Sequence, residues 1–186
     1  RLDRNPKMSN AEENHLEFYR RWHKLAGPYF QWQYEQFAPY LGARVADVGC
    51  GPGNLTANLL GKDYYLGVDL DPDMLTELRR EYGSEGPVDT AVLDVSDPGI
   101  VPELQGRKID SILCCNLVEH IEDDRAAISN LANALPAGGT LGILVPAMPW
   151  LYGSLDRLDD HYRRYTKKSL VRCLENLPLT VEKLHY

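Results

Sequence analysis

The sequence predicts one α/β domain, a doubly wound and mostly parallel sheet with helices on both faces, preceded by an N-terminal helical extension. From Arg44 onward, short apolar runs alternate with stretches of helical periodicity, a pattern typical of βαβ units. A glycine-rich turn follows the first apolar run. The length of 186 residues, with 44% hydrophobic and 25% charged residues, suits a single globular core.

Residues 1–43 are predicted to be helical. Ser9 and Glu12 have the spacing of a capping box, and a helix is expected from there to about residue 26. A Gly-Pro pair then interrupts it, and an aromatic-rich segment follows over residues 29–40. We interpret these aromatic side chains as core or lid packing rather than as a recognition surface.

Residues 44–147 are predicted to form the sheet and its covering helices. Strands are expected at residues 45–48, 64–70, 88–93, 109–115 and 140–145. Helices are expected at residues 54–60, between Asp71 as the N-cap and Gly83 as the end, and from Asp123 to about residue 135. In the last segment, residues 148–186, Thr166 is expected to cap a helix running to residue 177, and residues 179–184 are predicted to form another strand.

Composition and charge narrow the possible partners. The net charge of −7 argues against a nucleic-acid partner, because phosphate binding depends on clustered Lys and Arg. No apolar run is long enough for a membrane span, and the four cysteines contain no C-x-x-C pair. Cys114 and Cys115, adjacent on one predicted strand, are expected to point to opposite faces. We therefore expect free thiols in a cytoplasmic protein.

The turn Asp47-Val-Gly-Cys-Gly-Pro-Gly53 ends the first predicted strand. Its glycines allow the backbone to turn sharply and approach a ligand, and the following helix directs free N–H groups to the same place. In a doubly wound sheet this is the ligand crevice, at the carboxyl ends of the strands. Asp69 and Asp94, at the ends of the next two predicted strands, are placed to accept ribose hydroxyls and an adenine amino group.

A dinucleotide is the alternative ligand for this crevice. The dinucleotide fingerprint G-x-G-x-x-G needs glycine at its sixth position, where this chain has Asn54. The observed spacing is G-x-G-x-G, with Asp47 two residues before the first glycine. A carboxylate there suits the cationic end of an amino-acid ligand better than a pyrophosphate. An NAD-dependent oxidoreductase therefore stays only as a less favoured hypothesis.

The segments VADVGCGPGN, GVDLDPDML, VLDVSDP, SILCCNLVEHIEDD and LPAGGTLGILVPA resemble, in order, the motifs of class I, Rossmann-like S-adenosylmethionine-dependent methyltransferases. The resemblance covers roughly residues 44–147. It implies that Asp47, Gly49 and Gly51 hold the methionine moiety, Asp69 the ribose, and Leu70 and Met74 the adenine face. Asp94 and Val95 would then hold the adenine edge. The remaining expected cofactor contacts are Cys50, Gly53, Asn116 and Leu117.

The chemistry is expected just after the fourth strand, at Glu119 and His120. His120 is a candidate general base, and Glu119 a candidate for orienting a polar acceptor. The alternative, that this pair caps the next helix and lines the cofactor pocket, stays open. The signature of amino-group methylation on nucleic-acid bases does not follow Asn116, so the acceptor is expected to be a small molecule: a metabolite, sugar or lipid-linked intermediate methylated on oxygen or nitrogen.

Residues 148–186 are expected to form the acceptor side. They resemble a D-x-x-x-G-H-x-R-R-Y element of bacterial small-molecule or glycan-linked methyltransferases, with Asp160 in place of the glycine. His161 and Tyr165 are further catalytic candidates. The candidate substrate-binding residues are Tyr152, Asp156, Arg163 and Arg164. The alternative for both arginines is that they pair with nearby aspartates and hold the loop.

Three expectations concern assembly and ligands. Sheets of this family usually end with an antiparallel strand beside the fifth, which we expect to be missing here, and a partner subunit in a homodimer would cover the exposed edge. No metal site is expected, because His15, His23 and His185 have no partner at ligand spacing. The competing non-enzymatic hypothesis is a scaffold or sensor that binds S-adenosylmethionine without turnover; it predicts tight cofactor binding and no S-adenosylhomocysteine.

Overall fold

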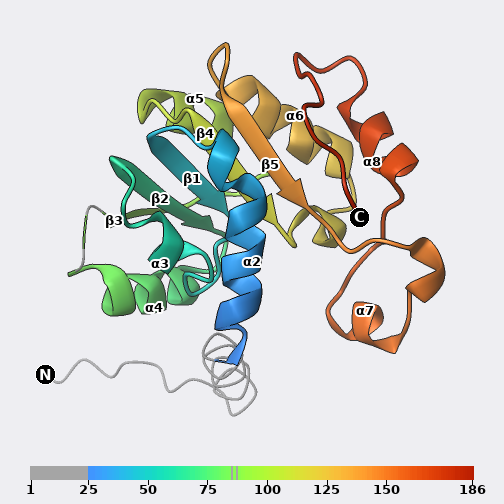
Figure 1. Cartoon of the computed structure of the whole chain (residues 1–186), viewed down its shortest axis with the longest axis horizontal. Coiled ribbons are helices and arrows are strands. Elements are labelled where there is room, and N and C mark those ends of the chain that lie inside the picture. Colours follow the sequence, from blue (N-terminus) through green and yellow to red (C-terminus); the bar gives the residue numbers. More distant parts are fainter. Residues whose placement is uncertain (1–24, 85, 87) are drawn as a thin grey trace, which may run out of the picture.

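Five parallel strands form the sheet, in the order β3-β2-β1-β4-β5. The computed structural model describes residues 25–84, 86 and 88–186 (Figure 1). The strands are β1 Arg44–Val48, β2 Tyr64–Asp69, β3 Val88–Val92, β4 Ser111–Cys115 and β5 Thr140–Leu144. Sequence order runs outward from β1 to β3 on one side and from β4 to β5 on the other, so the direction reverses between β1 and β4. The predicted doubly wound α/β fold is confirmed, and the crevice of such a fold lies at this reversal.

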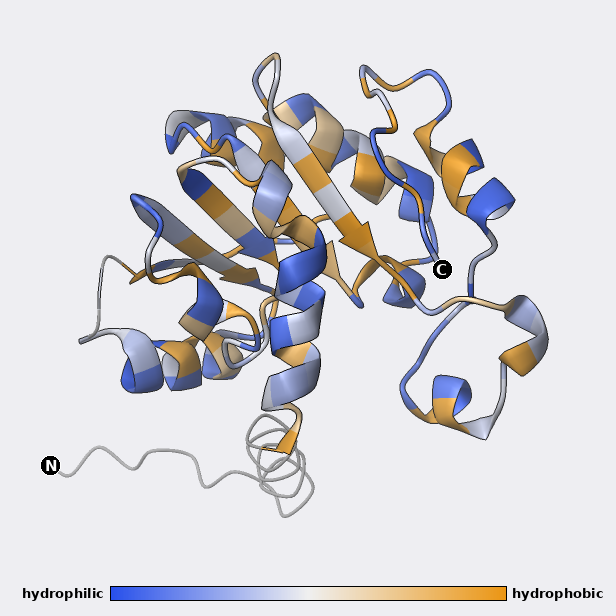
Figure 2. Cartoon of the chain, viewed as in Figure 1, coloured by the Kyte–Doolittle hydropathy of each residue, from blue (hydrophilic) through white to orange (hydrophobic). Residues whose placement is uncertain are grey.

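Helices cover both faces of the sheet, because successive strand residues point to opposite sides. Val45, Tyr65 and Leu113 pack with α2 Gly27–Phe37, α3 Thr56–Leu59 and α4 Pro72–Tyr82. Ala46, Leu66 and Ile112 pack with α5 Ile100–Gly106, α6 Asp124–Ala134 and α8 Lys167–Leu174. Apolar residues are concentrated on the strands and on the helix faces turned toward them (Figure 2).

The predicted opposition of the adjacent cysteines is also confirmed. Cys114 belongs to the cluster under α5 and α6, whereas Cys115 packs against the cluster under α2 to α4. All four cysteines are free thiols.

Local signals located several helix boundaries correctly. Asp71 caps α4 by accepting the Asp73 N–H at 2.8 Å, and α4 ends before Gly83. Asp123 caps α6 by accepting the Ala126 N–H at 3.0 Å. Thr166 caps α8 by accepting the Ser169 N–H at 3.0 Å. The predicted helix before residue 26 falls almost entirely on residues outside the described ranges.

Other boundaries differ from the prediction. Helix α3 spans a single turn rather than residues 54–60, because residues 53–55 still belong to the glycine turn. Helix α5 was not predicted; its seven residues carry only Ile100 and Leu104 as a buried pair. Helix α8 ends at Leu174, and residues 179–184 do not form the predicted strand. They pair with no neighbouring strand and leave Val181 46% exposed, so the apolar run lacks the ladder partner that a strand requires.

Three short 3-10 helices and one further α-helix make up the rest of the secondary structure in the described residues. These are η1 Ala38–Tyr40, η2 Val118–His120, η3 Pro149–Leu151 and α7 Ser154–Leu158. None of the described helices has the length and apolar character needed to cross a membrane.

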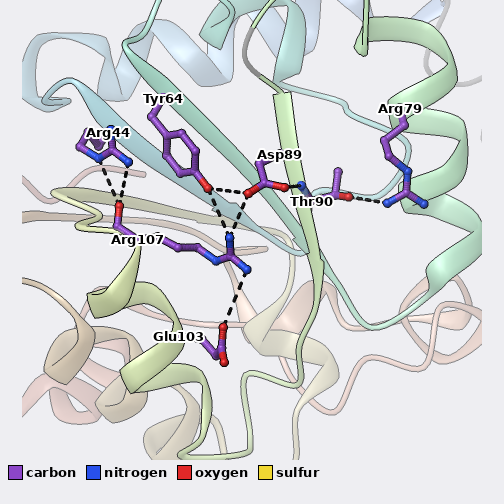
Figure 3. Close-up of polar contacts among 7 residues, drawn as sticks. All are labelled: Arg44, Tyr64, Arg79, Asp89, Thr90, Glu103 and Arg107. Carbon is purple, nitrogen blue, oxygen red and sulfur yellow. Dashed lines mark hydrogen bonds and ion pairs between the residues drawn. The ribbon is translucent and has the colours of Figure 1, made fainter.

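A polar network joins the amino ends of the first three strands (Figure 3). The Arg107 guanidinium lies 2.9 Å from Asp89 Oδ2, which also accepts the Tyr64 hydroxyl at 2.8 Å. Arg44 donates to the Arg107 carbonyl at 2.9 Å and stacks over the Tyr64 ring. The network therefore ties β1, β2 and β3 to the end of α5 at the edge opposite the glycine turn, which leaves the carboxyl ends of the strands for a ligand.

Candidate functional site

The glycine turn follows β1 at the point where strand order reverses. Gly49 has a φ of 78°, and its N–H and that of Cys50 both donate to the Val68 carbonyl, at 2.8 and 3.1 Å. A Cβ on Gly49 would lie 3.1 Å from three atoms of the Leu117 side chain. Gly53 is also left-handed, and a Cβ there would come within 2.8 Å of Thr56 Oγ1. Glycine is therefore needed at these positions both for backbone conformation and for space.

Asp69, at the end of β2, is hydrogen-bonded to the turn. Its Oδ2 accepts the Gly51 N–H at 2.8 Å, and its Oδ1 accepts the Asp71 N–H at 3.0 Å. Burial raises the pKa of this carboxyl, while these backbone donors oppose the rise. Asp69 is thus tied by hydrogen bonds both to the glycine turn and to the start of α4.

Asp47 lies beneath the turn and is only 2% exposed. Its nearest hydrogen-bond donor is the Tyr65 hydroxyl at 3.5 Å, which is itself within 2.7 Å of Thr56 Oγ1. Among the described residues, no Lys, Arg or His forms an ion pair with Asp47. Burial, followed by the neighbouring charge of Asp69, raises the pKa of Asp47 to about 7. A cationic ligand at this position would supply the missing counter-charge.

The expected adenine contacts are more varied in their exposure. Leu70, which directly follows β2, is 65% exposed, so its side chain is free to cover a ligand. Met74 is buried in α4. Asp94 is exposed and accepts the Ser96 N–H at 2.8 Å, and the buried Val95 accepts the Asn130 amide at 2.9 Å through its carbonyl. The structure places these residues after β2 and β3, side by side in the sheet.

The segment after β4 brings the second group of predicted residues to the same region. Asn116 is left-handed, with a φ of 53°, and Leu117 lies over Gly49. Glu119 and His120 follow in η2. Burial raises the pKa of the Cys114 thiol, and the nearby carboxylates of Glu119 and Asp47 raise it further.

Glu119 is fully buried, and neither of its side-chain oxygens has a hydrogen-bond partner among the described residues. Burial raises its pKa to about 8, with a smaller contribution from Asp159. A buried carboxyl without partners is costly and therefore uncommon.

His120 and His161 meet beside Glu119. Their rings lie 4.5 Å apart between centroids, edge to face at 89°. Burial lowers the pKa of His120, and His161 lowers it further. One side-chain ligand atom from each of Glu119, His120 and His161 can be chosen so that all three lie within 4.8 Å of one another. The structure thus brings three of the four predicted catalytic residues into one cluster.

A closed loop delivers His161 to this cluster. It begins at Ala147, shortly after β5 ends, and closes at Tyr165, where the two residues form an isolated parallel bridge, and the loop between them includes η3 and α7 (Figure 1). Asp156 is its hub: one carboxylate oxygen accepts Arg164 Nε at 2.6 Å and lies 3.1 Å from His161 Nδ1, and the other accepts the Gly153 N–H at 2.8 Å. The Arg164 guanidinium holds the pKa of Asp156 well below its usual range.

Residues 46–141 match a protein-family model described as a methyltransferase domain, and this match covers just over half of the chain. The chain belongs to the methyltransferase domain family. The predicted class I S-adenosylmethionine-dependent family, its fold and its cofactor are thereby confirmed.

Curated relatives of this methyltransferase domain include ubiquinone biosynthesis O-methyltransferases of several bacteria. The ubiquinone biosynthesis O-methyltransferase of Xanthomonas oryzae is 32% identical over 158 residues, which cover 76% of this chain and 64% of that protein. An uncharacterized methyltransferase of Mycobacterium bovis is 31% identical over 112 residues, 60% of this chain and 54% of that protein. The chain therefore spans about half to two thirds of the length of the curated relatives that it matches.

Solved structures show the same fold. An O-methyltransferase family protein from Burkholderia thailandensis superposes with a TM-score of 0.72 at 18% identity, over 91% of this chain and 55% of that one. An S-adenosylmethionine-dependent methyltransferase from Clostridium acetobutylicum superposes with a TM-score of 0.57 at 26% identity, over 71% of this chain and 58% of that one.

Arg163 and Arg164, the two arginines that were expected to bind the substrate, both form ion pairs within the methyltransferase domain. Arg164 pairs with Asp156, and Arg163 pairs with Asp124 Oδ2 at 2.8 Å while donating to the Glu122 carbonyl at 2.7 Å. The geometry therefore favours the alternative in which the arginines hold the loop. Tyr152 also holds it, since its hydroxyl donates to the His161 carbonyl at 2.7 Å.

Tyr165 lies in the core rather than in the His cluster. It is 3% exposed, and its hydroxyl donates to Asp124 Oδ2 at 2.7 Å. Burial and Asp124 both raise the pKa of the phenol. These contacts favour a structural role, in which Tyr165 fastens the returning end of the loop to α6.

Sequence reasoning missed two residues that shape the site. Tyr65 supplies the donor beneath Asp47, and nothing in the sequence of β2 distinguishes it from an ordinary core aromatic. The other residue is Asp159, whose Oδ2 lies 3.1 Å from His161 Nε2. It stands two positions before His161 within the element that resembles D-x-x-x-G-H-x-R-R-Y, and this short spacing was a signal that could have identified it. Asp160 adopts a φ of 53°, which explains why the similar sequence element has glycine at this position.

Proposed function

We propose that this domain transfers the methyl group of S-adenosylmethionine to an oxygen atom of a small molecule that carries an apolar part. The observation that supports the cofactor site best is Asp47: a buried carboxylate directly under a glycine turn, with which no cationic side chain of the described residues forms an ion pair. The ammonium group of the cofactor's methionine moiety is a cation of the right size for this place. Binding would turn an unfavourable buried charge into a hydrogen-bonded ion pair.

The other cofactor contacts follow from the ends of the strands. Gly49 and Gly51 allow the backbone to approach the methionine moiety, and Asp69 accepts the ribose hydroxyls. The exposed Leu70 covers one face of the adenine, and Asp94 accepts its amino group. The cofactor supplies a methyl group on a positively charged sulfur, already activated for displacement, so the protein must mainly align the acceptor and exclude water.

Oxygen is the proposed acceptor atom for two reasons. The Xanthomonas relative is named as an O-methyltransferase. The half-buried His120, whose pKa is lowered, presents a neutral imidazole that can accept a hydroxyl proton, with Glu119 and His161 beside it. Nitrogen acceptors that are already neutral need no such group.

An apolar part of the acceptor is proposed from the closed loop. Trp150, Leu155 and Leu158 are 72%, 75% and 82% exposed, next to the polar cluster in sequence and on the same loop. Large apolar side chains gathered on an exposed loop are typical of a binding surface. A lipid-linked intermediate would place its chain against them and its hydroxyl at His120.

Binding and turnover test this proposal separately. Isothermal titration should show heat with S-adenosylmethionine and none with NAD. Phenols with and without prenyl tails should then be offered as acceptors while release of S-adenosylhomocysteine is followed, and the tailed phenols should react faster. An Asp47→Asn variant should lose cofactor affinity, whereas Asp73→Asn, a matched change in the exposed first turn of α4, should retain it. Cofactor binding without product from any acceptor would instead support the scaffold hypothesis.

A further inference from the structure

The cluster of Glu119, His120 and His161 has the composition of a metal site. The chosen ligand atoms of the three residues lie within 4.8 Å of one another. Two come from η2 and one from the closing limb of the loop, and the Tyr162 N–H fastens that limb to the Glu119 carbonyl at 2.8 Å. Ligands about 2.1 Å from a tetrahedral ion lie about 3.4 Å apart, so side-chain rotations of modest size would close the cluster around one ion.

Glu119 points to a cation independently of this spacing. It is fully buried, and neither carboxylate oxygen has a hydrogen-bond partner among the described residues. Buried carboxylates are normally paired with a cation or coordinate a metal. No Lys or Arg in the described part of the chain forms an ion pair with Glu119, so a bound metal ion is the partner that this position lacks.

His161 is held as metal-binding histidines usually are. Asp156 is 2% exposed and pairs with Arg164 Nε at 2.6 Å, and its Oδ1 lies 3.1 Å from His161 Nδ1 and accepts the proton of that nitrogen, so Nε2 is left as the ligand atom. A carboxylate behind the histidine in this way fixes the ring and strengthens it as a ligand. Asp159, now 3.1 Å from Nε2, has a side chain 61% exposed and can rotate into solvent to release that nitrogen.

We infer that Glu119, His120 and His161 bind one divalent transition-metal ion, with Asp156 as the positioning residue. Two imidazoles and one carboxylate are a ligand set for Zn²⁺ and its first-row neighbours, whereas Mg²⁺ and Ca²⁺ prefer sites made of oxygen ligands. Three protein ligands leave a coordination position open for a water molecule or an acceptor oxygen.

The use of this ion in catalysis rests on the proposed function, although its binding does not. A metal-bound hydroxyl ionises more readily, as metal-bound water does. The acceptor's proton would then pass to solvent, its oxygen would form a bond to the methyl carbon, and the carbon–sulfur bond would break with its electron pair remaining on sulfur. In this arrangement His120 serves as a ligand, and no protein base is needed because the metal ion lowers the pKa of the bound hydroxyl.

The test begins with metal binding by the full chain. The protein is stripped with a chelator, desalted, and titrated calorimetrically with ZnCl₂ and, separately, with MgCl₂. Zn²⁺ should bind saturably at one site, substitutions in the cluster should remove that binding, and Mg²⁺ should not compete for the site. Co²⁺ offers a readout that needs no variant, because a four-coordinate site of this type gives visible absorption far stronger than that of hydrated Co²⁺, and Zn²⁺ should abolish it.

Variants then locate the site. Glu119→Gln and His161→Gln, which keep the side-chain volume similar, should each weaken Zn²⁺ binding by about tenfold or more, and Asp156→Asn should weaken it by about 10- to 100-fold through the orientation of His161. His185→Gln, at an exposed histidine outside the cluster, is the matched control and should bind as the unaltered chain does. S-adenosylmethionine titration and circular dichroism confirm that each variant is folded.

The outcomes separate this proposal from the proposed function. Absence of saturable Zn²⁺ and Co²⁺ binding, or equal Zn²⁺ binding by Glu119→Gln, His161→Gln and the unaltered chain, overturns the metal site. Methyl transfer that persists in chelator would in that case leave the proposed function standing, with His120 as the base. Zn²⁺ binding at the cluster in a chain that takes up no S-adenosylmethionine would support the metal site and overturn the proposed function.

Discussion

Replacing Asp47 with asparagine should make the free protein more stable and the cofactor bind more weakly. The buried carboxyl of Asp47 has its pKa raised from 3.8 to about 7. Each pKa unit corresponds to about 1.4 kcal/mol, so keeping this group ionised in the folded chain costs about 4 kcal/mol. Asparagine has nearly the same shape and no charge, and so lacks that cost.

The pH dependence gives the sign of the effect. Below pH 3.8 Asp47 is protonated in both the folded and the unfolded chain, and the two proteins should differ little. Between pH 3.8 and about 7 the folded chain retains a proton that the unfolded chain has lost, so this group's contribution to stability falls as pH rises. Above pH 7 the variant should exceed the unaltered protein by its full advantage, about 4 kcal/mol.

Urea denaturation of the free protein at several pH values, followed by tryptophan fluorescence, measures this difference. Calorimetry at pH 8 measures the affinity of the variant for S-adenosylmethionine. This affinity should fall by about 10- to 100-fold because one hydrogen-bonded ion pair is lost. Asp73→Asn should change neither quantity. A stability difference that is constant from pH 4 to pH 8 would refute the assignment of the cost to burial of the Asp47 charge.

Three further substitutions test other parts of the structure. Asp160→Val should lower the free energy of unfolding by about 1–2 kcal/mol, because a β-branched residue is strained at a φ of 53°, whereas Asp160→Gly should not lower it; equal effects in thermal melts would contradict this reasoning. Tyr165→Phe should cost about 1–2 kcal/mol through loss of the hydroxyl's bond to Asp124, with turnover unchanged, and a large loss of turnover would instead make Tyr165 catalytic. Gly49→Ala should weaken S-adenosylmethionine binding by about tenfold or more in calorimetry, because its Cβ would press on Leu117 and strain the turn; unchanged affinity would show that the turn is not the cofactor site.

Much of the fold was predictable because its signals are local. Short apolar runs located all five strands to within two residues of their observed ends, and Asp71, Asp123 and Thr166 were correctly expected to cap or begin helices. The errors arose where local signals are weak or insufficient. Helix α5 is too short to show periodicity, and residues 179–184 have strand-like composition but no strand beside them to pair with.

The sequence by itself determined where the proposed cofactor half of the site lies. Asp47 and the glycines lie within seven residues, Asp69 ends β2 and Asp94 follows the end of β3, and the parallel arrangement of these strands brings the residues to one edge of the sheet. Tertiary structure alone decided the acceptor half. Glu119 and His161 are 42 positions apart in sequence, and only the closed loop, fastened by Asp156, Arg164 and Tyr165, brings them together. Burial of Glu119 without a hydrogen-bond partner among the described residues likewise depends on the whole packed core, so the need for a counter-charge could not be inferred from residues near it in sequence.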